Sequence, residues 1–234
     1  MINSFLLIGQ SNMAGRGSLG EVEPIENKDI LMFRSNTWIT AKEPLHTDKP
    51  ELAGVGLGMS FAETLQKKYG KKIGLIPCAF GGTSLDEWKK DGALYSNAVS
   101  AALEAQKNSC LKGILWHQGE NDADMLETAE SYKDRFLTFI DPLFKDLGVS
   151  NMPVVLGELG EYLVSFGGCT YSHIVNAQLS QLARQEKYLE LVSVKGLTDR
   201  GDFLHFNSES LREFGRRYAE AWELCSKNLG ICLE

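Results

Sequence analysis

The chain changes character abruptly near its start, in the stretch Phe5-Leu6-Leu7-Ile8-Gly9-Gln10-Ser11-Asn12-Met13-Ala14-Gly15. The apolar run that opens this stretch predicts a buried β-strand, and the small and polar residues after it predict a turn. Ser11 then lies just beyond the carboxyl end of a strand, which is where ligands bind in open α/β sheets. Serine and asparagine are also ordinary helix-capping residues. This stretch alone leaves a nucleophile and a simple turn as alternatives.

Length, charge and cysteine content limit the class of protein. The 234 residues suffice for one domain over residues 1-234 with a large core. A net charge of -7 argues against nucleic acid and membrane surfaces as partners, and favours a neutral or weakly charged substrate. The five cysteines form no C-x-x-C pair, so we expect neither a disulfide framework nor a zinc site. Because no signal-peptide pattern opens the chain, we expect a cytoplasmic protein; the sequence predicts no oligomeric state.

Strand and helix patterns alternate along the whole chain. After residues 5–8, apolar runs predict strands at 29–33, 72–76, 113–116, 153–157 and 189–194. Apolar residues at helical spacing predict helices at 57–69, 94–106, 132–147 and 174–185, and a last helix capped by Asn207 or Ser208, with a capping box between Ser210 and Glu213. This alternation predicts an α/β protein with a central parallel sheet between two layers of helices, a three-layer α/β/α domain.

The stretch from residue 34 to about Gly56 is expected to be irregular. Prolines in and before it, such as Pro44 and Pro50, discourage a long helix. Long loops in compact domains are often functional, and this one contains Trp38 and His46.

Polar residues gather at four predicted strand ends. They are Ser11, the turn at Gly81 and Gly82, the run from His117 to Asp122, and Asp202-Phe203-Leu204-His205. Because the carboxyl ends of parallel strands share one edge of a sheet, we expect these four segments to converge.

The residue types at these ends fit acyl transfer by a serine. Ser11 needs a base to remove its proton, and a histidine base needs a carboxylate to orient its ring. Asp202 and His205 are three residues apart, so one turn can present both side chains in the same direction. Backbone N–H groups at Gly81 and Gly82 can stabilise an oxyanion, and a side-chain amide from Gln118 or Asn121 can add a donor.

A metal site is the alternative interpretation of the third segment. His117, Glu120, Asp122 and Asp124 carry ligand atoms, but their spacing matches neither H-x-x-x-H nor a calcium loop. We therefore expect no metal and no other cofactor. His46 and His173 have no local partner and are interpreted as structural or surface residues.

The same segments resemble the sequence blocks of the sialate O-acetylesterase-type domain. The matching blocks are Gly9-Gln10-Ser11-Asn12-Met13-Ala14-Gly15, Gly81-Gly82-Thr83-Ser84 leading to Trp88, Trp116-His117-Gln118-Gly119-Glu120, and Asp202-x-x-His205. That group includes the acetylxylan esterases of carbohydrate esterase family six and belongs to the SGNH/GDSL hydrolase superfamily. The blocks occur in the expected order from residue 9 to residue 205. The resemblance implies a flavodoxin-like fold and metal-independent removal of acetyl groups from a sugar.

The resemblance also implies roles for individual residues. Ser11 is the nucleophile and His205 the base, with Asp202 as the orienting acid. The Ser11 and Gly82 amides form the oxyanion hole together with Gln118. Two points stay open, since Asn121 fits the superfamily pattern G-x-N-D as the third donor, and Glu120 could share or replace the role of Asp202.

The substrate is then expected to be a small-molecule or oligosaccharide acetyl ester. Trp88 or Trp38 could stack on a sugar ring, although a core role is at least as well supported for each. Two other functions remain, namely an esterase or thioesterase acting on a non-carbohydrate acyl group and a catalytically weak carbohydrate-binding homologue. The sequence identifies neither the sugar nor the acetyl position.

Overall fold

The elements alternate in the computed structural model, which describes all residues 1–234, much as the pattern predicts. The strands are β1 (Ile2–Gly9), β2 (Ile30–Arg34), β3 (Thr37–Thr40), β4 (Lys72–Pro77), β5 (Cys110–His117), β6 (Val154–Gly157) and β7 (Leu189–Val192). The helices are α1 (Ser11–Ala14), α2 (Leu57–Tyr69), α3 (Ala93–Gln106), α4 (Leu126–Glu130), α5 (Tyr132–Asp146), α6 (Ser172–Gln185) and α7 (Ser208–Leu229). Short 3-10 turns are η1 (Leu85–Trp88), η2 (Asn121–Ala123) and η3 (Glu161–Ser165).

The sheet has the order β3-β2-β4-β1-β5-β6-β7 and is parallel except for the pairing of β2 with β3. Without the β2–β3 hairpin, the order β4-β1-β5-β6-β7 is the 2-1-3-4-5 order of flavodoxin-like folds. The chain adds β4 on one side of β1 and then crosses to β5 on the other side. This switch point lies at β1, and the predicted fold class is confirmed.

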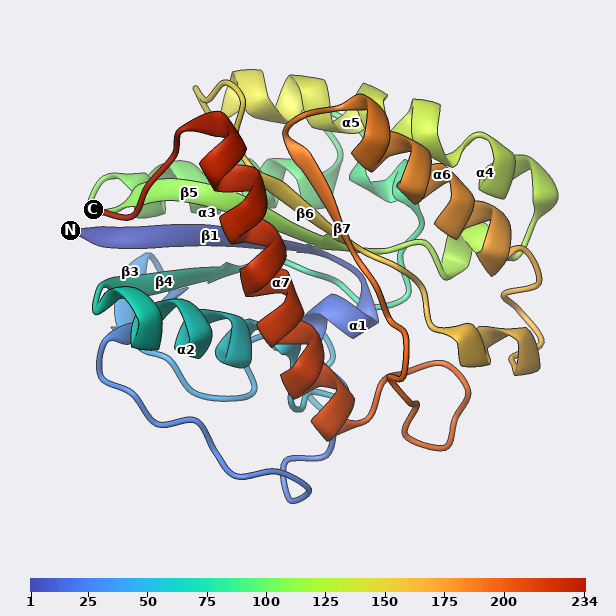
Figure 1. The fold of residues 1–234 in the computed structure, drawn as a ribbon, viewed down its shortest axis with the longest axis horizontal. Helices are drawn as coiled ribbons and strands as arrows, with labels where there is room; N and C mark the ends of the chain where they lie inside the picture. The colour runs from blue at the N-terminus through green and yellow to red at the C-terminus, as the bar shows by residue number, and fades with distance from the viewer.

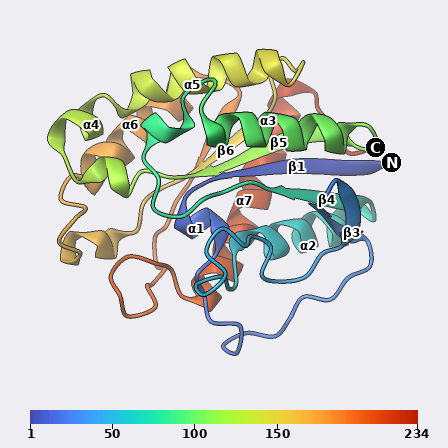
Figure 2. The same cartoon turned by 180° about the vertical axis from the view of Figure 1, so that it is seen from behind.

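The side chains of β1 alternate between the two helical layers. Phe5 and Leu7 pack with α2 and α7 in one hydrophobic cluster, and Leu6 and Ile8 pack with α3, α5 and α6 in the other. Figure 1 shows α2 and α7 crossing one face of the sheet, and Figure 2 shows α3 on the opposite side. A strand with both faces covered is apolar at every position, as residues 5–8 are.

The hairpin that adds β3 was not expected, because residues 34–56 were predicted to be irregular. Ser35 and Asn36 connect the strands and both have positive φ angles of 49° and 59°, the geometry that two-residue hairpin turns require. β3 is an edge strand that buries little, so its sequence lacks a clear alternation of apolar residues. Trp38 packs edge-on against Phe33, with ring centroids 5.1 Å apart, and does not reach the cavity described below.

The last helix confirms one predicted cap and contradicts another detail. Asn207 is the N-cap of α7, and its side chain accepts the Ser210 N–H at 2.8 Å. Glu213 does not close a capping box with Ser210, because its carboxylate pairs with Arg216 and Arg217. Two guanidinium groups within one helical turn compete successfully for that carboxylate.

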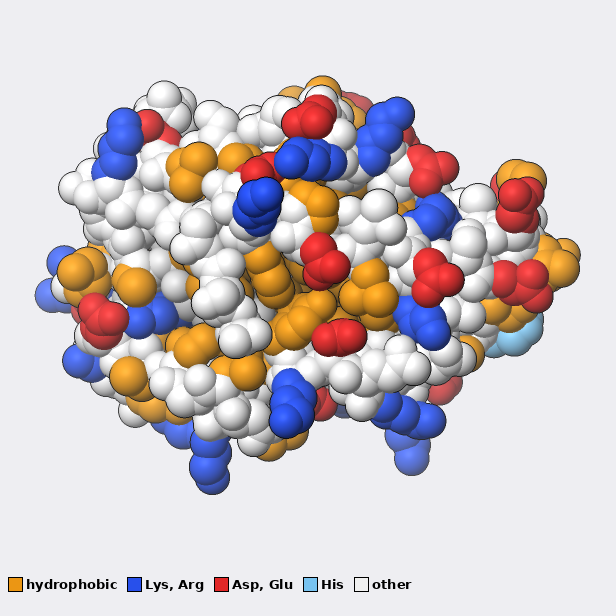
Figure 3. All heavy atoms as spheres, turned by 90° about the horizontal axis from the view of Figure 1, so that it is seen from above, with side chains coloured by type: hydrophobic (Ala, Val, Ile, Leu, Met, Phe, Trp, Pro, Cys, Tyr) orange, Lys and Arg blue, Asp and Glu red, His pale blue; other side chains and the backbone are white.

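The surface carries charges of both signs. Figure 3 shows the face that lies uppermost in Figure 1, where acidic and basic side chains are interspersed around a strip of hydrophobic atoms. None of the helices combines the length and the hydropathy that crossing a bilayer requires.

We predict that Phe5→Ala lowers the free energy of unfolding by about 3–5 kcal/mol, because the buried ring leaves a cavity. The Phe5 ring meets Phe61 at 4.8 Å and Trp222 at 5.3 Å between centroids, so it joins β1 to both helices of one layer. Urea unfolding measures the loss. Leu103→Ala at a half-exposed position of α3 is the control, with an expected change within about 0.5 kcal/mol. A Phe5→Ala change no larger than that of the control contradicts this account.

Candidate active site

Residues from all four predicted strand ends line one cavity of about 330 Å³ beside the switch point. Its lining comprises Gln10, Ser11, Arg16, Lys49, Leu52, Gly81, Gly82, Glu120, Asn121, Asp124, Phe166, Gly168, Cys169, Leu204 and His205. Ser11 begins α1 directly after β1, and His205 comes from the loop between β7 and α7. Both loop and α1 lie at the same end of the sheet in Figure 1.

Ser11, His205 and Asp202 form a continuous chain of hydrogen bonds. The Ser11 Oγ lies 3.0 Å from His205 Nε2, and His205 Nδ1 lies 2.8 Å from Asp202 Oδ2. The other Asp202 oxygen accepts the N–H groups of Leu204 and His205 at 2.9 and 2.7 Å. Burial of Asp202 opposes its ionisation, but the bonds from His205 and Leu204 outweigh it and lower the pKa of this carboxyl. This geometry is the one that a serine nucleophile, a histidine base and an orienting carboxylate would require.

The loop that carries Asp202 and His205 is held in a strained conformation by its own side chains. Asp199 Oδ2 accepts the N–H groups of Gly201 and Phe203 at 2.8 and 2.7 Å. Phe203 has a φ of 57°, in the left-handed region that a bulky residue rarely adopts. Its side chain is half exposed. The local hydrogen bonds, rather than packing of the ring, therefore hold this backbone.

The exit of β1 requires glycine at position 9. Gly9 has a φ of 129°, and a Cβ atom there would clash with the carbonyl oxygen of His117. The Gln10 N–H donates to the same carbonyl at 2.8 Å, which extends the β1–β5 contact beyond the strands. This close approach fixes where Ser11 emerges from the sheet.

A buried ion pair holds the glycine turn after β4. Asp48 Oδ2 accepts the Gly81 N–H at 2.7 Å and lies 2.6 Å from Arg16 Nη2. Burial opposes ionisation of Asp48, but Arg16 and the Gly81 N–H outweigh it and lower the pKa of that carboxyl. The next residue, Gly82, has a φ of 79° that favours glycine. No protein group accepts the N–H of Gly82 or of Ser11.

The two candidate side-chain amides have different surroundings. Asn121 lines the cavity, and its Nδ2 donates to the Gly82 carbonyl at 3.0 Å, which leaves its second N–H without a protein acceptor. Gln118 is fully buried behind the cavity, and its Nε2 donates to Gln10 Oε1, Thr83 O and Asp122 Oδ2. The expected role of Gln118 as an oxyanion donor therefore does not fit this geometry, because its N–H groups are already used within the core.

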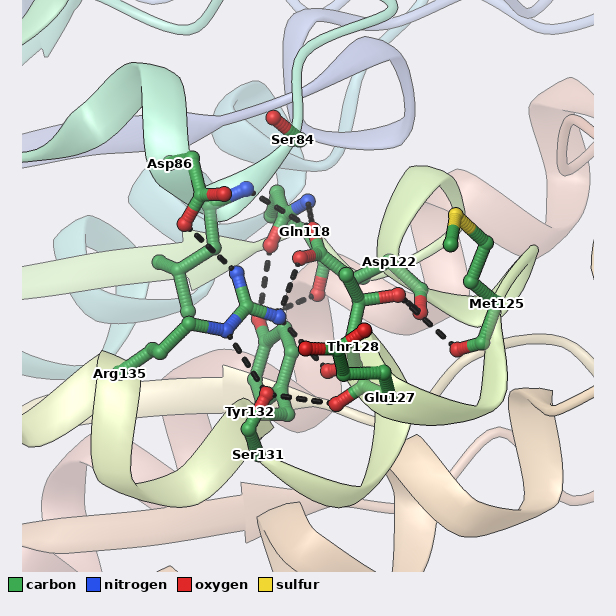
Figure 4. Close-up of polar contacts among 12 residues, drawn as sticks. Ser84, Asp86, Gln118, Asp122, Met125, Glu127, Thr128, Ser131, Tyr132 and Arg135 are labelled. Carbon is green, nitrogen blue, oxygen red and sulfur yellow. Dashed lines mark hydrogen bonds and ion pairs between the residues drawn. The ribbon is translucent and has the colours of Figure 1, made fainter.

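Gln118 belongs to a buried polar network that supports the segment after β5. Asp122 accepts the Leu85 N–H at 2.8 Å and pairs with Arg135 Nη2 at 2.6 Å. The Tyr132 hydroxyl donates to the Gln118 side-chain oxygen at 2.9 Å. Figure 4 shows Arg135 reaching Asp122 from α5 and Gln118 pointing into the same cluster. The network holds the backbone on which Asn121 sits.

Glu120, which the sequence left open as a second carboxylate for His205, does not contact that histidine. Its Oε1 accepts from Asn12 Nδ2 at 2.5 Å and lies 3.7 Å from His117 Nδ1, while both nitrogens of His205 are engaged by Ser11 and Asp202. Asp202 is therefore the carboxylate on the histidine.

The side chains of the alternative metal interpretation have separate partners. His117 Nε2 faces the Glu158 carbonyl at 3.2 Å, and Asp122 serves Arg135 and the Leu85 N–H. No group of three or more His, Cys, Asp or Glu residues has a geometry that could hold a metal ion.

The aromatic side chain at the cavity is Phe166, which the sequence did not single out. Trp88 is fully buried and packs against Trp116 with ring centroids 5.5 Å apart, so it cannot stack on a ligand. Phe166 follows η3 and is half-buried at the cavity wall. The loop after β6 carries no motif, so no sequence signal could have identified it. The sequence also contains no signal for the ion pair of Arg16 and Asp48, because neither residue belongs to a recognisable motif.

His46 is a buried histidine beside this ion pair. Neither ring nitrogen has a hydrogen-bond partner, and burial lowers the pKa of His46 to about 4, although Asp48 acts in the opposite direction. His173 is exposed on α6. The two histidines without local partners are thus one core residue and one surface residue.

We predict that His46 destabilises the folded protein as the pH falls. From pH 6.5 down to about 4 the unfolded chain binds a proton at this position that the folded protein does not, so the free energy of unfolding decreases. Relative to wild type, His46→Leu should gain about 3 kcal/mol between about pH 7 and pH 4. Urea unfolding across this range measures the difference, with His173→Leu as the control for removing a histidine. A difference that does not change with pH contradicts the prediction.

Comparisons with known proteins identify the family of this chain. A family model described as carbohydrate esterase, sialic acid-specific acetylesterase, matches residues 1–223. A probable carbohydrate esterase of Arabidopsis thaliana is 33% identical to this chain in an alignment 239 residues long, gaps included. The alignment covers 93% of this chain and 89% of that protein. Its X-ray structure superposes with a TM-score of 0.86 at 32% identity over 94% of this chain and 97% of that one.

Two more distant structures share the fold. NanS has a TM-score of 0.78 at 18% identity, over 95% of this chain and 96% of that one. A carbohydrate acetylesterase from Xanthomonas citri has a TM-score of 0.69 at 17% identity, over 99% of this chain and 57% of that one. The chain therefore belongs to the sialic acid-specific acetylesterase family of carbohydrate esterases, and it is a carboxylic ester hydrolase that removes acetyl groups from carbohydrates.

Proposed function

We propose that Ser11, His205 and Asp202 carry out the deacetylation of a sugar ester through an acetyl-serine intermediate. The observation that supports this most directly is the unbroken hydrogen-bond chain from Asp202 through His205 to the Ser11 hydroxyl at the cavity wall. A base within 3.0 Å of a serine hydroxyl meets the geometric condition for general-base catalysis.

The first step transfers the acetyl group to the protein. His205 Nε2 takes the Ser11 proton as Oγ bonds to the acetyl carbonyl carbon, and Asp202 stabilises the resulting imidazolium. When the tetrahedral intermediate collapses, the bond to the sugar oxygen breaks and His205 returns the proton to that oxygen. The sugar alcohol leaves with its hydroxyl restored.

The second step releases acetate. Water replaces the sugar, His205 removes its proton, and the hydroxide attacks the acetyl carbon. The bond to Ser11 Oγ then breaks, the proton returns from His205 to Ser11, and the product departs as acetic acid, which loses its proton to water and becomes acetate. The same base thus serves both steps.

We assign oxyanion stabilisation to the backbone N–H groups of Ser11 and Gly82 and to the Asn121 side chain. The two backbone donors have no protein acceptor, and one N–H of Asn121 is free while the other bonds to Gly82. Removing one such donor typically costs about 2.7–4 kcal/mol of transition-state stabilisation.

We further propose that the substrate is a small acetylated sugar or the terminal unit of a longer one. A cavity of about 330 Å³ lies at the lower end of the range for small-molecule sites. Phe166 offers an apolar face for a sugar ring, and Lys49 and Asp124 bring opposite charges to the wall. A panel of acetylated xylan, acetylated sialic acid and an aryl acetate distinguishes the sugars from a non-carbohydrate acyl substrate.

We predict that Ser11→Ala reduces acetate release by about 10⁴-fold or more, because the acetyl group has no acceptor. Acetate release from the panel is compared with that of Ser96→Ala, an exposed serine on α3 that should retain wild-type rates. An organophosphonate should label the wild type at Ser11 and leave Ser11→Ala unlabelled. Retained hydrolysis by Ser11→Ala contradicts the mechanism, and a wild type that binds sugar without releasing acetate indicates a carbohydrate-binding homologue.

We also predict that the buried ion pair matters more for rate than for folding. Asp48→Leu leaves Arg16 charged and unpaired, which should cost about 3–5 kcal/mol of stability, while Arg16→Met with Asp48→Leu should recover most of it. The double variant should release acetate about 10²–10³-fold more slowly than the wild type, because no carboxylate at position 48 holds the Gly81 N–H. Urea unfolding and kcat measure the two effects. A double variant that is both stable and fully active contradicts the prediction.

A further inference from the structure

Asn12, the residue after the proposed nucleophile, joins three of the four segments that build the site. It is almost completely buried, with 2% of its surface exposed. Its Oδ1 accepts the Phe206 N–H at 3.1 Å, and its Nδ2 donates to the Leu204 carbonyl at 3.1 Å and to Glu120 Oε1 at 2.5 Å. Every hydrogen-bonding group of this amide is therefore used.

Two of these bonds flank His205 in the chain. The peptide group before His205 is held through the Leu204 carbonyl, and the residue after it is held through the Phe206 N–H. Asn12 is covalently bound to Ser11. The side chain thus connects the backbone of the nucleophile to the backbone on both sides of the base.

The other contacts of the histidine loop do not supply this connection. Asp202 bonds to Leu204 and His205, and Asp199 bonds to Gly201 and Phe203, all within four residues. These bonds set the ring relative to its own loop. Outside the loop, Arg200 reaches the Arg16 carbonyl, but this contact lies five residues before His205. Among the backbone contacts made from outside the loop, those from Asn12 are the ones on the residues next to the histidine.

Glu120 fixes which way the Asn12 amide points. A carboxylate only accepts hydrogen bonds, so the NH2 group faces Glu120 and the oxygen must face the Phe206 N–H. The second oxygen of Glu120 is buried without a partner, and the facing His117 Nδ1 also has none. Burial lowers the pKa of His117 although Glu120 opposes it, which favours the neutral form of the ring.

We propose that Asn12 is a positioning residue, held by Glu120, that sets the distance between the Ser11 hydroxyl and the His205 ring. This inference rests on the proposed function, since it assigns a reason for the 3.0 Å Ser11–His205 contact. It gives Glu120 a role that does not involve touching His205. Misplacing a reacting group by about 1 Å can reduce a rate by about 10²-fold.

The experiment compares Asn12→Asp, Glu120→Gln and the double variant. In Asn12→Asp a carboxylate oxygen faces both Glu120 and the Leu204 carbonyl, so kcat should fall by about 100-fold while KM changes little. Glu120→Gln alone should lose less, because the new amide oxygen still accepts from Asn12. In the double variant the amide introduced at position 120 donates to the carboxylate introduced at position 12. The kcat of the double variant should therefore be about 10-fold higher than that of Asn12→Asp. Asn108→Asp, exposed in the turn before β5, controls for the added charge.

Two readouts separate positioning from a structural role and from the function itself. Thermal unfolding shows whether each variant is folded, and the rate of organophosphonate labelling at Ser11 reports the Ser11–His205 pair without a sugar. The proposal is supported if Asn12→Asp is labelled more slowly than the wild type and if adding Glu120→Gln partly restores the labelling rate. Equal labelling of wild type and Asn12→Asp, or a double variant no better than Asn12→Asp, overturns it. A wild type that is labelled but releases no acetate contradicts the proposed function alone.

Discussion

The hydrogen bond from the Gln10 N–H to the His117 carbonyl is the contact on which the site depends. It continues the pairing of β1 with β5 past the end of both strands. The approach leaves no room for a Cβ atom at position 9, so the chain turns sharply at Gly9 and Ser11 starts a single helical turn. Because β1 is the switch point of the sheet, loops after β4 and β5 reach Ser11 from opposite sides.

Much of this could be predicted from the sequence, because the signals are local. Apolar runs between turns identify the buried strands, and polar residues at their ends mark the edge where they meet. The three-residue spacing of Asp202 and His205 fits one turn, and the loop between them does bring both side chains together. The β2–β3 hairpin was missed because an edge strand with little burial has no apolar alternation to detect.

The remaining details depend on contacts between distant segments. Gln118 and Asn121 carry the same amide group. Contacts of Gln118 with Gln10, Thr83, Asp122 and Tyr132 hold it in the core, while Asn121 faces the cavity. A pattern of residue types cannot distinguish two amides three positions apart. The sequence likewise has no signal for an ion pair whose two members come from separate loops.

The polar groups behind the cavity explain how a site built from loops keeps its geometry. The Asp202–His205 unit is made by one strained loop, and a left-handed residue such as Phe203 costs about 1–3 kcal/mol. Local hydrogen bonds can hold that shape but not its distance from the sheet. Buried side chains such as Asn12, whose polar atoms all have partners, connect the loop to α1 at the end of β1. Such connections resist displacement because an unpaired buried polar group is costly. The precision of the site therefore comes from polar contacts between segments, while the hydrophobic clusters of the two layers supply the stability.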